Sequence, residues 1–193
     1  MPRPKKFDKD EILERAMRLF WQKGFEATSI QDLVEHTGIN KQSLYDTFGD
    51  KRALYAAALN HYRTANECRF GELLAEGTSA KQALRAFFDR VIGETAADAD
   101  RKGCFMNNAM VELSAGDEEI GRLCGDNMRS METKFARLIK DGQSTGEIRR
   151  ALDAEATAAF LFAALSGLQA VSKITPEKEK LEQIAATSLS VLE

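Results

Sequence analysis

Cysteine and histidine are scarce in this sequence. Its 193 residues include three cysteines and two histidines. Cys68, Cys104 and Cys124 are odd in number and widely spaced, which argues against both a disulfide framework and a CxxC motif. His36 and His61 lie far apart and have no neighbouring ligand cluster. We therefore predict no metal site, no cofactor and no disulfide, and we expect a reducing, cytoplasmic environment.

The sequence also lacks a long uninterrupted apolar run. Its longest apolar stretch, residues 156–171, contains Thr157, Ser166 and Gln169 and is shorter than the roughly 20 residues that span a bilayer. The basic N-terminus leads into a charged amphipathic stretch, and the apolar core of a secretory signal does not follow it. We therefore predict a buried helix over 156–171 in a cytoplasmic protein.

Catalytic motifs are almost absent. Residues 142–146, Gly-Gln-Ser-Thr-Gly, match the G-x-S-x-G nucleophile elbow. That elbow requires a strand before it and a histidine after the serine, whereas a helical pattern leads into Ser144 and both histidines precede it. Phosphate-binding loops, dinucleotide fingerprints and HExxH or EF-hand patterns are also missing. These absences predict a protein that is not an enzyme, with a loop at 142–146.

The net charge of −3 conceals an uneven distribution. Residues 1–52 contain ten Lys/Arg and nine Asp/Glu, net +1, whereas the remainder contains seventeen and twenty-one, net −4. Arg3, Lys5 and Lys6 form one local positive cluster, and Lys51 with Arg52 forms another. Because DNA binding depends on a local basic footprint, the overall charge does not argue against nucleic acid.

Apolar residues recur at helical spacing along nearly the whole chain, and no long stretch alternates with period two. This pattern predicts an all-α fold of about nine helices. We expect helices at about 8–24, 28–38, 40–48, 50–69, 79–92, 104–113, 117–142, 153–172 and 175–192. Capping boxes are predicted at Asp8 with Glu11, at residues 28–31 and at Ser79 with Gln82, and Pro176 should occupy the first position of the last helix.

The second and third of these helices are short and joined by a tight turn at Gly38, which is typical of a helix-turn-helix. The second helix of such a motif enters the major groove, where its outward side chains contact base edges. The expected base-contacting residues are Lys41, Gln42, Ser43 and Thr47. The expected phosphate-contacting residues are Thr28, Ser29, Tyr45 and Lys51.

The first 55 residues closely resemble the tetracycline-repressor (TetR) family of bacterial regulators. The matching positions are Ile12 to Phe20, Lys23 to Phe25, Thr28 to Leu33, Gly38 to Lys41, Leu44, Tyr45, Phe48, Asp50, Lys51, Leu54 and Tyr55. The resemblance implies a helix-turn-helix DNA-binding domain at 1–52 and a helical ligand-binding and dimerisation domain at 53–193. It further implies that helices five to seven surround a ligand cavity and that the last two helices form a homodimer core.

The eighth helix is apolar nearly all round, and a monomer surface tolerates such a helix poorly. The expected dimer contacts are Phe160, Leu161, Leu165, Leu168, Leu181, Ile184 and Ser188. A dimer would present two reading helices about 34–36 Å apart, as a palindromic DNA site requires. Burial inside a larger monomer fold is the alternative explanation.

Aromatic and thioether side chains of the C-terminal domain could line an adaptable cavity, although most of them could equally be core. The expected effector contacts are Phe87, Phe88, Val91, Phe105, Met106, Asn108, Met110, Met128, Met131 and Phe135. Cys104 lies at a predicted helix start after Arg101 and Lys102, an environment that can lower a thiol pKa. It is a candidate sensor of oxidants or electrophiles, or simply a small buried side chain.

These patterns together predict a sequence-specific transcriptional repressor that binds a palindromic double-stranded DNA operator as a homodimer. A small molecule or modification of a cysteine would relieve the repression. A transcriptional activator, or a regulator controlled by a partner protein, remains the alternative with the same fold.

Overall fold

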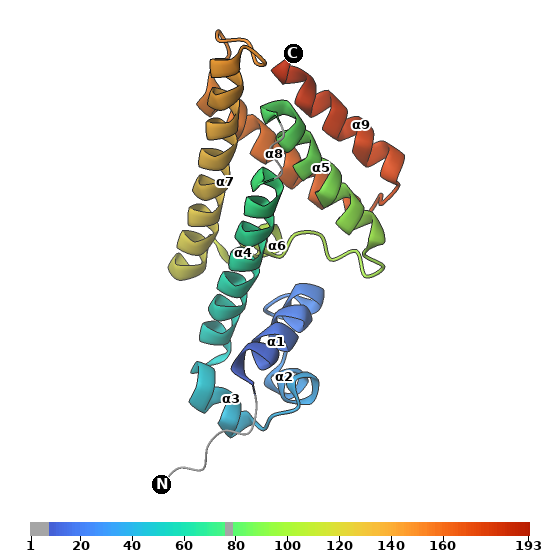
Figure 1. The fold of residues 1–193 in the computed structure, drawn as a ribbon. Helices are drawn as coiled ribbons and strands as arrows, with labels where there is room; N and C mark the ends of the chain where they lie inside the picture. The colour runs from blue at the N-terminus through green and yellow to red at the C-terminus, as the bar shows by residue number, and fades with distance from the viewer. Residues whose placement is uncertain (1–7, 76–78) are drawn as a thin grey trace.

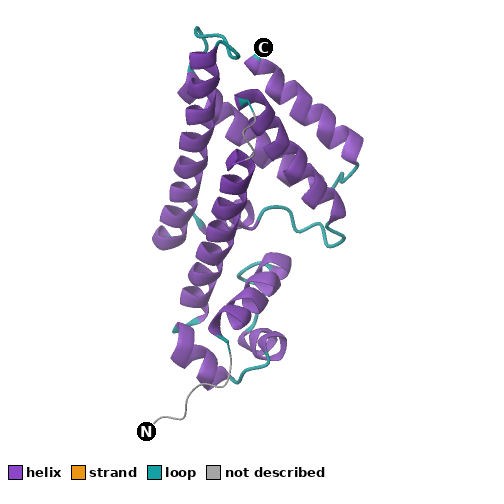
Figure 2. Ribbon diagram, viewed as in Figure 1, coloured by secondary structure: helices purple, strands orange, loops and turns teal. Residues whose placement is uncertain are grey.

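The computed structural model describes residues 8–75 and 79–193. Within these residues all regular structure is helical, and no strand occurs (Figure 2). The helices are α1 (Lys9–Lys23), α2 (Ile30–Thr37), α3 (Lys41–Phe48), α4 (Lys51–Ala75), α5 (Ala80–Ala97), α6 (Phe105–Leu113), α7 (Glu118–Thr145), α8 (Ala154–Ser172) and α9 (Lys178–Leu189), followed by a short 3-10 turn, Ser190–Leu192. The all-α prediction is confirmed, and the predicted cluster Arg3, Lys5 and Lys6 lies outside the described residues.

Helices α1, α2 and α3 gather at one end of the molecule, beside the beginning of α4 (Figure 1). We call these three helices the head. Leu33 and Leu44 are completely buried and fix α2 and α3 against α1 and α4. The turn at Gly38 has a φ of 77°, in the left-handed region that glycine adopts without strain. The predicted helix-turn-helix is therefore present.

Two of the predicted caps differ from the structure. Helix α2 begins one residue later than expected, and its capping box pairs Ser29 with Asp32. At α1, the Asp8 side chain accepts a hydrogen bond from the N–H of Asp10, as expected of a cap. The Glu11 carboxylate, however, accepts from the Arg15 guanidinium and does not complete a capping box with Asp8. The caps at Asn40, at Asp50 and at Ser79 with Gln82 are confirmed.

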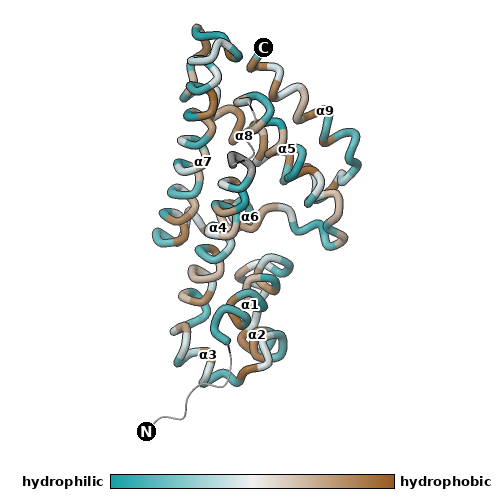
Figure 3. The backbone as a smooth tube through the Cα atoms, viewed as in Figure 1, coloured by the Kyte–Doolittle hydropathy of each residue, from teal (hydrophilic) through white to brown (hydrophobic). Residues whose placement is uncertain are grey.

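Helix α4 extends from the head into the second part of the molecule, where α5, α7, α8 and α9 pack together (Figure 1). The residues along α7 alternate between hydrophilic and hydrophobic, as expected of a helix with one buried face (Figure 3). Helix α6 and the segment before it lie between the two parts. The buried side chains of α6 belong to the same apolar cluster as the head, so α6 is packed directly against the head.

Helix α8 has one face inside the protomer and one outside it, and α9 packs against the inner side. Leu161, Leu165, Leu168 and Leu181 are buried in the apolar cluster of α5, α7, α8 and α9, and Ser188 is buried with its hydroxyl donating to a backbone carbonyl of its own helix. These five residues are therefore not available for the predicted contacts between protomers. Ile184 is partly buried against the same cluster, whereas Phe160 is 50% exposed.

Helix α8 is also long and apolar enough to cross a membrane by length and composition, contrary to the expectation from the sequence. In the fold it packs against α5, α7 and α9. Pro176 precedes the last helix, which begins after Glu177, so its predicted place in the first helical position is wrong.

Candidate DNA-binding surface and effector cavity

Helix α3 carries the predicted reading residues around its buried anchor, Leu44, with Gln42 on the opposite face and Lys41 and Thr47 on either side of the anchor. Leu44 is buried, whereas Lys41 and Gln42 are exposed and Ser43 and Thr47 are partly exposed. The helical spacing explains this arrangement, because one apolar position in the middle of two turns leaves the remaining face free. All four side chains expected to contact bases are thus at least partly accessible.

Hydrogen bonds along α3 hold two of these side chains in place. The Gln42 amide donates from Nε2 to Oδ1 of Asp46 at 2.8 Å, and the Thr47 hydroxyl donates to the Ser43 carbonyl at 2.7 Å. The Asp46 carboxylate is therefore engaged by a neighbour on its own helix. A bidentate amide such as that of Gln42 is suited to the N6 and N7 edge of adenine.

Two lysines of the head and one at the start of α4 lie close to aromatic rings. The ammonium of Lys41 is 5.6 Å from the ring centroid of Tyr45, and that of Lys51 is 4.3 Å from the ring centroid of Phe25. Lys9, which was not among the predicted site residues, lies 5.5 Å from the ring of Phe48. Because an aromatic face attracts and orients a cation, these contacts hold positive charge at the surface of the head.

The beginning of α2 differs from the predicted phosphate site. Thr28 is completely buried and its hydroxyl donates to the Gly24 carbonyl at 2.6 Å, so it does not reach the surface. The hydroxyl and N–H of the exposed Ser29 both bond to the Asp32 carboxylate. The Lys23 ammonium, 2.7 Å from that carboxylate, holds the pKa of Asp32 well below its usual range. A negative side chain therefore already occupies this helix start.

Arg52 is committed to another contact. Its guanidinium donates to both carboxylate oxygens of Asp117, at 2.5 and 2.7 Å, and lies 3.1 Å from Glu119. These hydrogen bonds lower the pKa of Asp117 to about 2. The pair joins the first turn of α4 to the first turn of α7, and it leaves the partly buried Lys51 as the cation of this cluster that forms no ion pair among the described residues.

The head is attached to both ends of α6. Before α6, the Trp21 indole donates from Nε1 to the Gly103 carbonyl at 3.1 Å. Near its other end, the Glu112 carboxylate accepts from the backbone N–H groups of Phe25 and Glu26 at 3.1 and 3.0 Å. Glu112 thus binds the loop between α1 and α2. A displacement of α6 would therefore be transmitted directly to the head.

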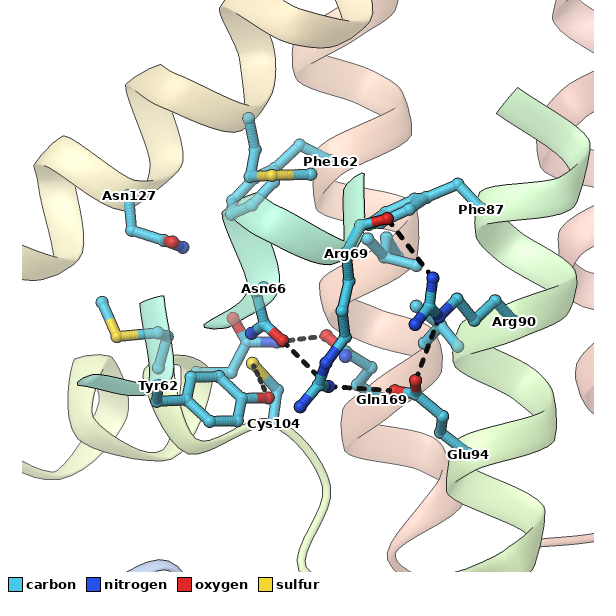
Figure 4. Close-up of a pocket in the computed structure, with 15 residues that line it drawn as sticks. Tyr62, Asn66, Arg69, Phe87, Arg90, Glu94, Cys104, Asn127, Phe162 and Gln169 are labelled. Carbon is cyan, nitrogen blue, oxygen red and sulfur yellow. Dashed lines mark hydrogen bonds and ion pairs between the residues drawn. The ribbon is translucent and has the colours of Figure 1, made fainter. Parts of the chain in front are cut away.

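A cavity of about 80 Å³ lies between α4, α5, α6, α7 and α8 (Figure 4). The residues that line it are Tyr62, Asn66, Arg69, Phe87, Arg90, Val91, Glu94, Cys104, Met106, Asn107, Asn127, Met131, Phe162, Leu165 and Gln169. Phe87, Val91, Met106 and Met131 were among the expected effector contacts. The volume is below the roughly 300–1,000 Å³ of pockets for drug-sized ligands, so the cavity suits a small ligand.

The other expected effector contacts lie elsewhere. Phe88 and Phe135 are completely buried in the apolar core, and Phe105 packs edge-on against Tyr55 and Tyr62. Asn108 bonds to the Lys102 carbonyl, and neither Met110 nor Met128 lines the cavity. These residues satisfied the apolar pattern because a core side chain and a cavity side chain have the same spacing along a helix.

Most residues that the prediction missed are polar, and Arg69 and Glu94 among them are exposed at the rim of the cavity. Tyr62, Asn66 and Arg69 recur at helical spacing on α4, and Arg90 and Glu94 do so on α5. Tyr62 is buried and Asn66 is partly buried, and polar side chains at such positions are costly unless water, a partner or a ligand satisfies them. That recurrence is the sequence signal by which the cavity could have been found.

Cys104 borders the cavity, but its environment differs from the expected one. Burial raises the pKa of its thiol, and Tyr62 donates a long hydrogen bond to its sulfur at 3.8 Å. The adjacent cation, Lys102, is held by Asp98 and Asp100 at 2.5 and 3.1 Å and is thereby neutralised locally. The expectation of a lowered pKa is wrong, because desolvation outweighs the helix start.

Comparison with known proteins agrees with this architecture. Residues 12–58 match the family model of bacterial regulatory proteins of the tetR family, and residues 80–188 match that of a tetracyclin repressor-like C-terminal domain. The chain is 34% identical to the HTH-type transcriptional repressor ComR of Escherichia coli (strain K12), over 97% of this chain and 90% of that protein. It is 32% identical to the HTH-type transcriptional regulator YezE of Bacillus subtilis (strain 168), over the full length of both.

A solved structure of a cysteine mutant of the TetR-family regulator CifR, complexed with 26-bp double-strand operator DNA, has the same fold. Its TM-score is 0.89 at 26% identity, and the alignment covers all of both chains. The fold and the exposed reading helix define a helix-turn-helix transcriptional regulator. The chain belongs to the TetR family of bacterial regulatory proteins.

Proposed function

We propose that this protein is a transcriptional repressor that binds a palindromic double-stranded operator as a homodimer, and that a small molecule entering the cavity releases the DNA. The observation that carries the proposal is the position of α6. This helix supplies Met106 and Asn107 to the cavity and is attached to the head through Gly103 and Glu112. We place the DNA-binding domain at residues 1–52 and the ligand and dimer domain at 53–193, in the cytoplasm.

The outward face of α8 supports the homodimer. Phe160 is 50% exposed, and Ile174, just beyond the helix, is 82% exposed. Small or apolar exposed residues continue the same stripe along the helix at positions 156, 159, 163, 167, 170 and 171. Such a stripe lets two helices approach closely and bury apolar surface. The copy of α8 in a partner protomer is the surface that we propose to cover it.

Release would then proceed through α6. A ligand between α4, α5 and α6 displaces the start of α6, which changes the Trp21 contact and the Glu112 contact to the α1–α2 loop. The two reading helices consequently lose the spacing that both half-sites require. A noncovalent ligand fits this scheme better than modification of Cys104, because a thiol with a raised pKa is a poor nucleophile near neutral pH.

Selection of bound sequences from random double-stranded DNA tests the operator proposal, because it requires no assumed binding site. The expected product is a palindrome whose half-sites are about 34–36 Å apart, or a multiple of that distance. Gln42→Ala should relax the preference at one position of each half-site, at a cost of about 1–3 kcal/mol. Gln183→Ala, which removes an exposed glutamine of α9, is the matched control and should leave the selected site unchanged.

An asymmetric selected site, or an unchanged site with Gln42→Ala, would contradict the proposed mode of binding. Affinity measured at several salt concentrations adds a second check. Lys51→Ala should reduce the magnitude of the slope of log K against log salt by about 1.8, as expected when each protomer of the dimer loses one phosphate contact.

A further inference from the structure

The mouth of the cavity carries three charged residues. Arg69 comes from α4, whereas Arg90 and Glu94 come from one face of α5 (Figure 4). Nε of Arg90 lies 3.2 Å from the Glu94 carboxylate, and Nη1 of Arg69 lies 3.9 Å from it. Two guanidinium groups therefore share one carboxylate, which leaves one positive charge at the mouth.

Many donors of the two guanidinium groups are uncommitted. Among the described residues, Arg69 uses only Nη1, which bonds to the Asn66 side chain and pairs weakly with Glu94. Arg90 uses Nε toward Glu94 and Nη1 toward the Arg69 carbonyl. Since a guanidinium carries five N–H donors in a planar fork, each arginine can still accommodate an incoming carboxylate.

The inner part of the cavity is mainly apolar on one side. Phe87 and Val91 of α5, Met131 of α7, and Phe162 and Leu165 of α8 form this side. On the other side the amides of Asn107 and Gln169 bond to each other at 3.1 Å. A ligand that fills the space therefore needs a small apolar body, with its polar group at the mouth.

We propose that the effector is a small amphipathic monocarboxylate, whose apolar body packs among Phe87, Met131 and Phe162 and whose carboxylate binds Arg69 and Arg90. The inference rests on the proposed release by a cavity ligand and names the chemical class of that ligand. A neutral ligand would cover guanidinium donors without offering a charged acceptor. A phosphate monoester would bring nearly two negative charges to a mouth with one excess positive charge and the Glu94 carboxylate.

Calorimetric titration of the full chain without DNA tests the ligand class. The probes are phenylacetate, 3-phenylpropionate and 4-methylpentanoate, each compared with its uncharged amide of the same shape. We expect at least one acid to bind about tenfold or more tightly than its amide, as a charge-assisted hydrogen bond implies. Equal binding of acids and amides, or no binding of any acid at millimolar concentration, would overturn the proposal.

Two opposite substitutions at the mouth sharpen the test. Arg90→Gln should weaken binding of the acid by about tenfold or more and leave binding of the amide unchanged. Glu94→Gln should tighten binding of the acid by about threefold, because it removes the competing carboxylate. Both side chains are partly exposed, so both variants should fold, which thermal melting checks. Weaker acid binding in Glu94→Gln would overturn the proposal.

Operator binding separates this inference from the proposed function. An acid that binds with the expected dependence on Arg90, yet leaves the affinity for the selected DNA site unchanged, supports the ligand class and contradicts release through the cavity. Release of the DNA by the amides alone supports release and overturns the monocarboxylate.

Discussion

The contact between Glu112 and the α1–α2 loop makes the sharpest prediction about coupling. Glu112→Ala removes a carboxylate that accepts two backbone N–H groups, those of Phe25 and Glu26. A hydrogen bond to a charged group contributes about 1.5–3 kcal/mol when buried, but Glu112 is exposed and water replaces part of that. We expect a loss of about 1–2 kcal/mol in the free energy of unfolding. For a chain of this size that corresponds to a fall in Tm of roughly 2–8 °C.

The assay combines thermal melting with amide hydrogen exchange. In Glu112→Ala the amides of Phe25 and Glu26 should exchange faster, and the ratio of operator affinities without and with a cavity ligand should move toward one. Glu112→Gln, which keeps one acceptor oxygen, should fall between the alanine variant and the wild type. Glu72→Ala removes an exposed glutamate without a hydrogen bond among the described residues and serves as the control. Unchanged exchange at both amides would refute the role of Glu112.

Three further predictions address the dimer, the α4–α7 contact and the cysteines. Phe160→Glu should dissociate the dimer in sedimentation experiments and leave the helical circular dichroism intact, because this side chain is exposed in the protomer. The Arg52 contact, helped by the N–H groups of Glu119 and Ile120, lowers the pKa of Asp117 from 3.8 to about 2, so the stabilisation should be complete above pH about 4 and lost as the pH falls toward 2; urea unfolding of Arg52→Ala should show a weaker dependence. Iodoacetamide at pH 7 should label exposed Cys68 faster than Cys104, whose thiol pKa is raised by burial, and equal rates would refute that environment.

The helices and several caps of this fold could be predicted because their signals are local. Asn40 and Asp50 cap helices with side chains that act within three residues of their own position, and such geometry does not depend on the rest of the fold. The reading surface could be predicted for the same reason. Leu44 is the only strongly apolar side chain at the centre of α3, so the side chains on the opposite face must be accessible.

The cavity and the dimer surface depend on how helices meet, which spacing along one helix does not determine. Helix α8 is apolar on both sides, so the sequence could not distinguish Leu161, which packs inside the protomer, from Phe160, which faces outward. Thr28 has a residue type that suits a phosphate contact, but tertiary packing turned its hydroxyl inward. The contact of Glu112 with the head joins segments more than eighty positions apart and has no local signal.

Footprinting of the purified protein on the DNA flanking its own gene, at fixed salt, determines whether α3 reads the operator. We expect protection of a palindrome by the wild-type chain and by Gln183→Ala. Lys41→Ala together with Gln42→Ala should abolish that protection while sedimentation shows an intact dimer. Undiminished protection by this double variant would contradict the assignment of α3 as the reading helix.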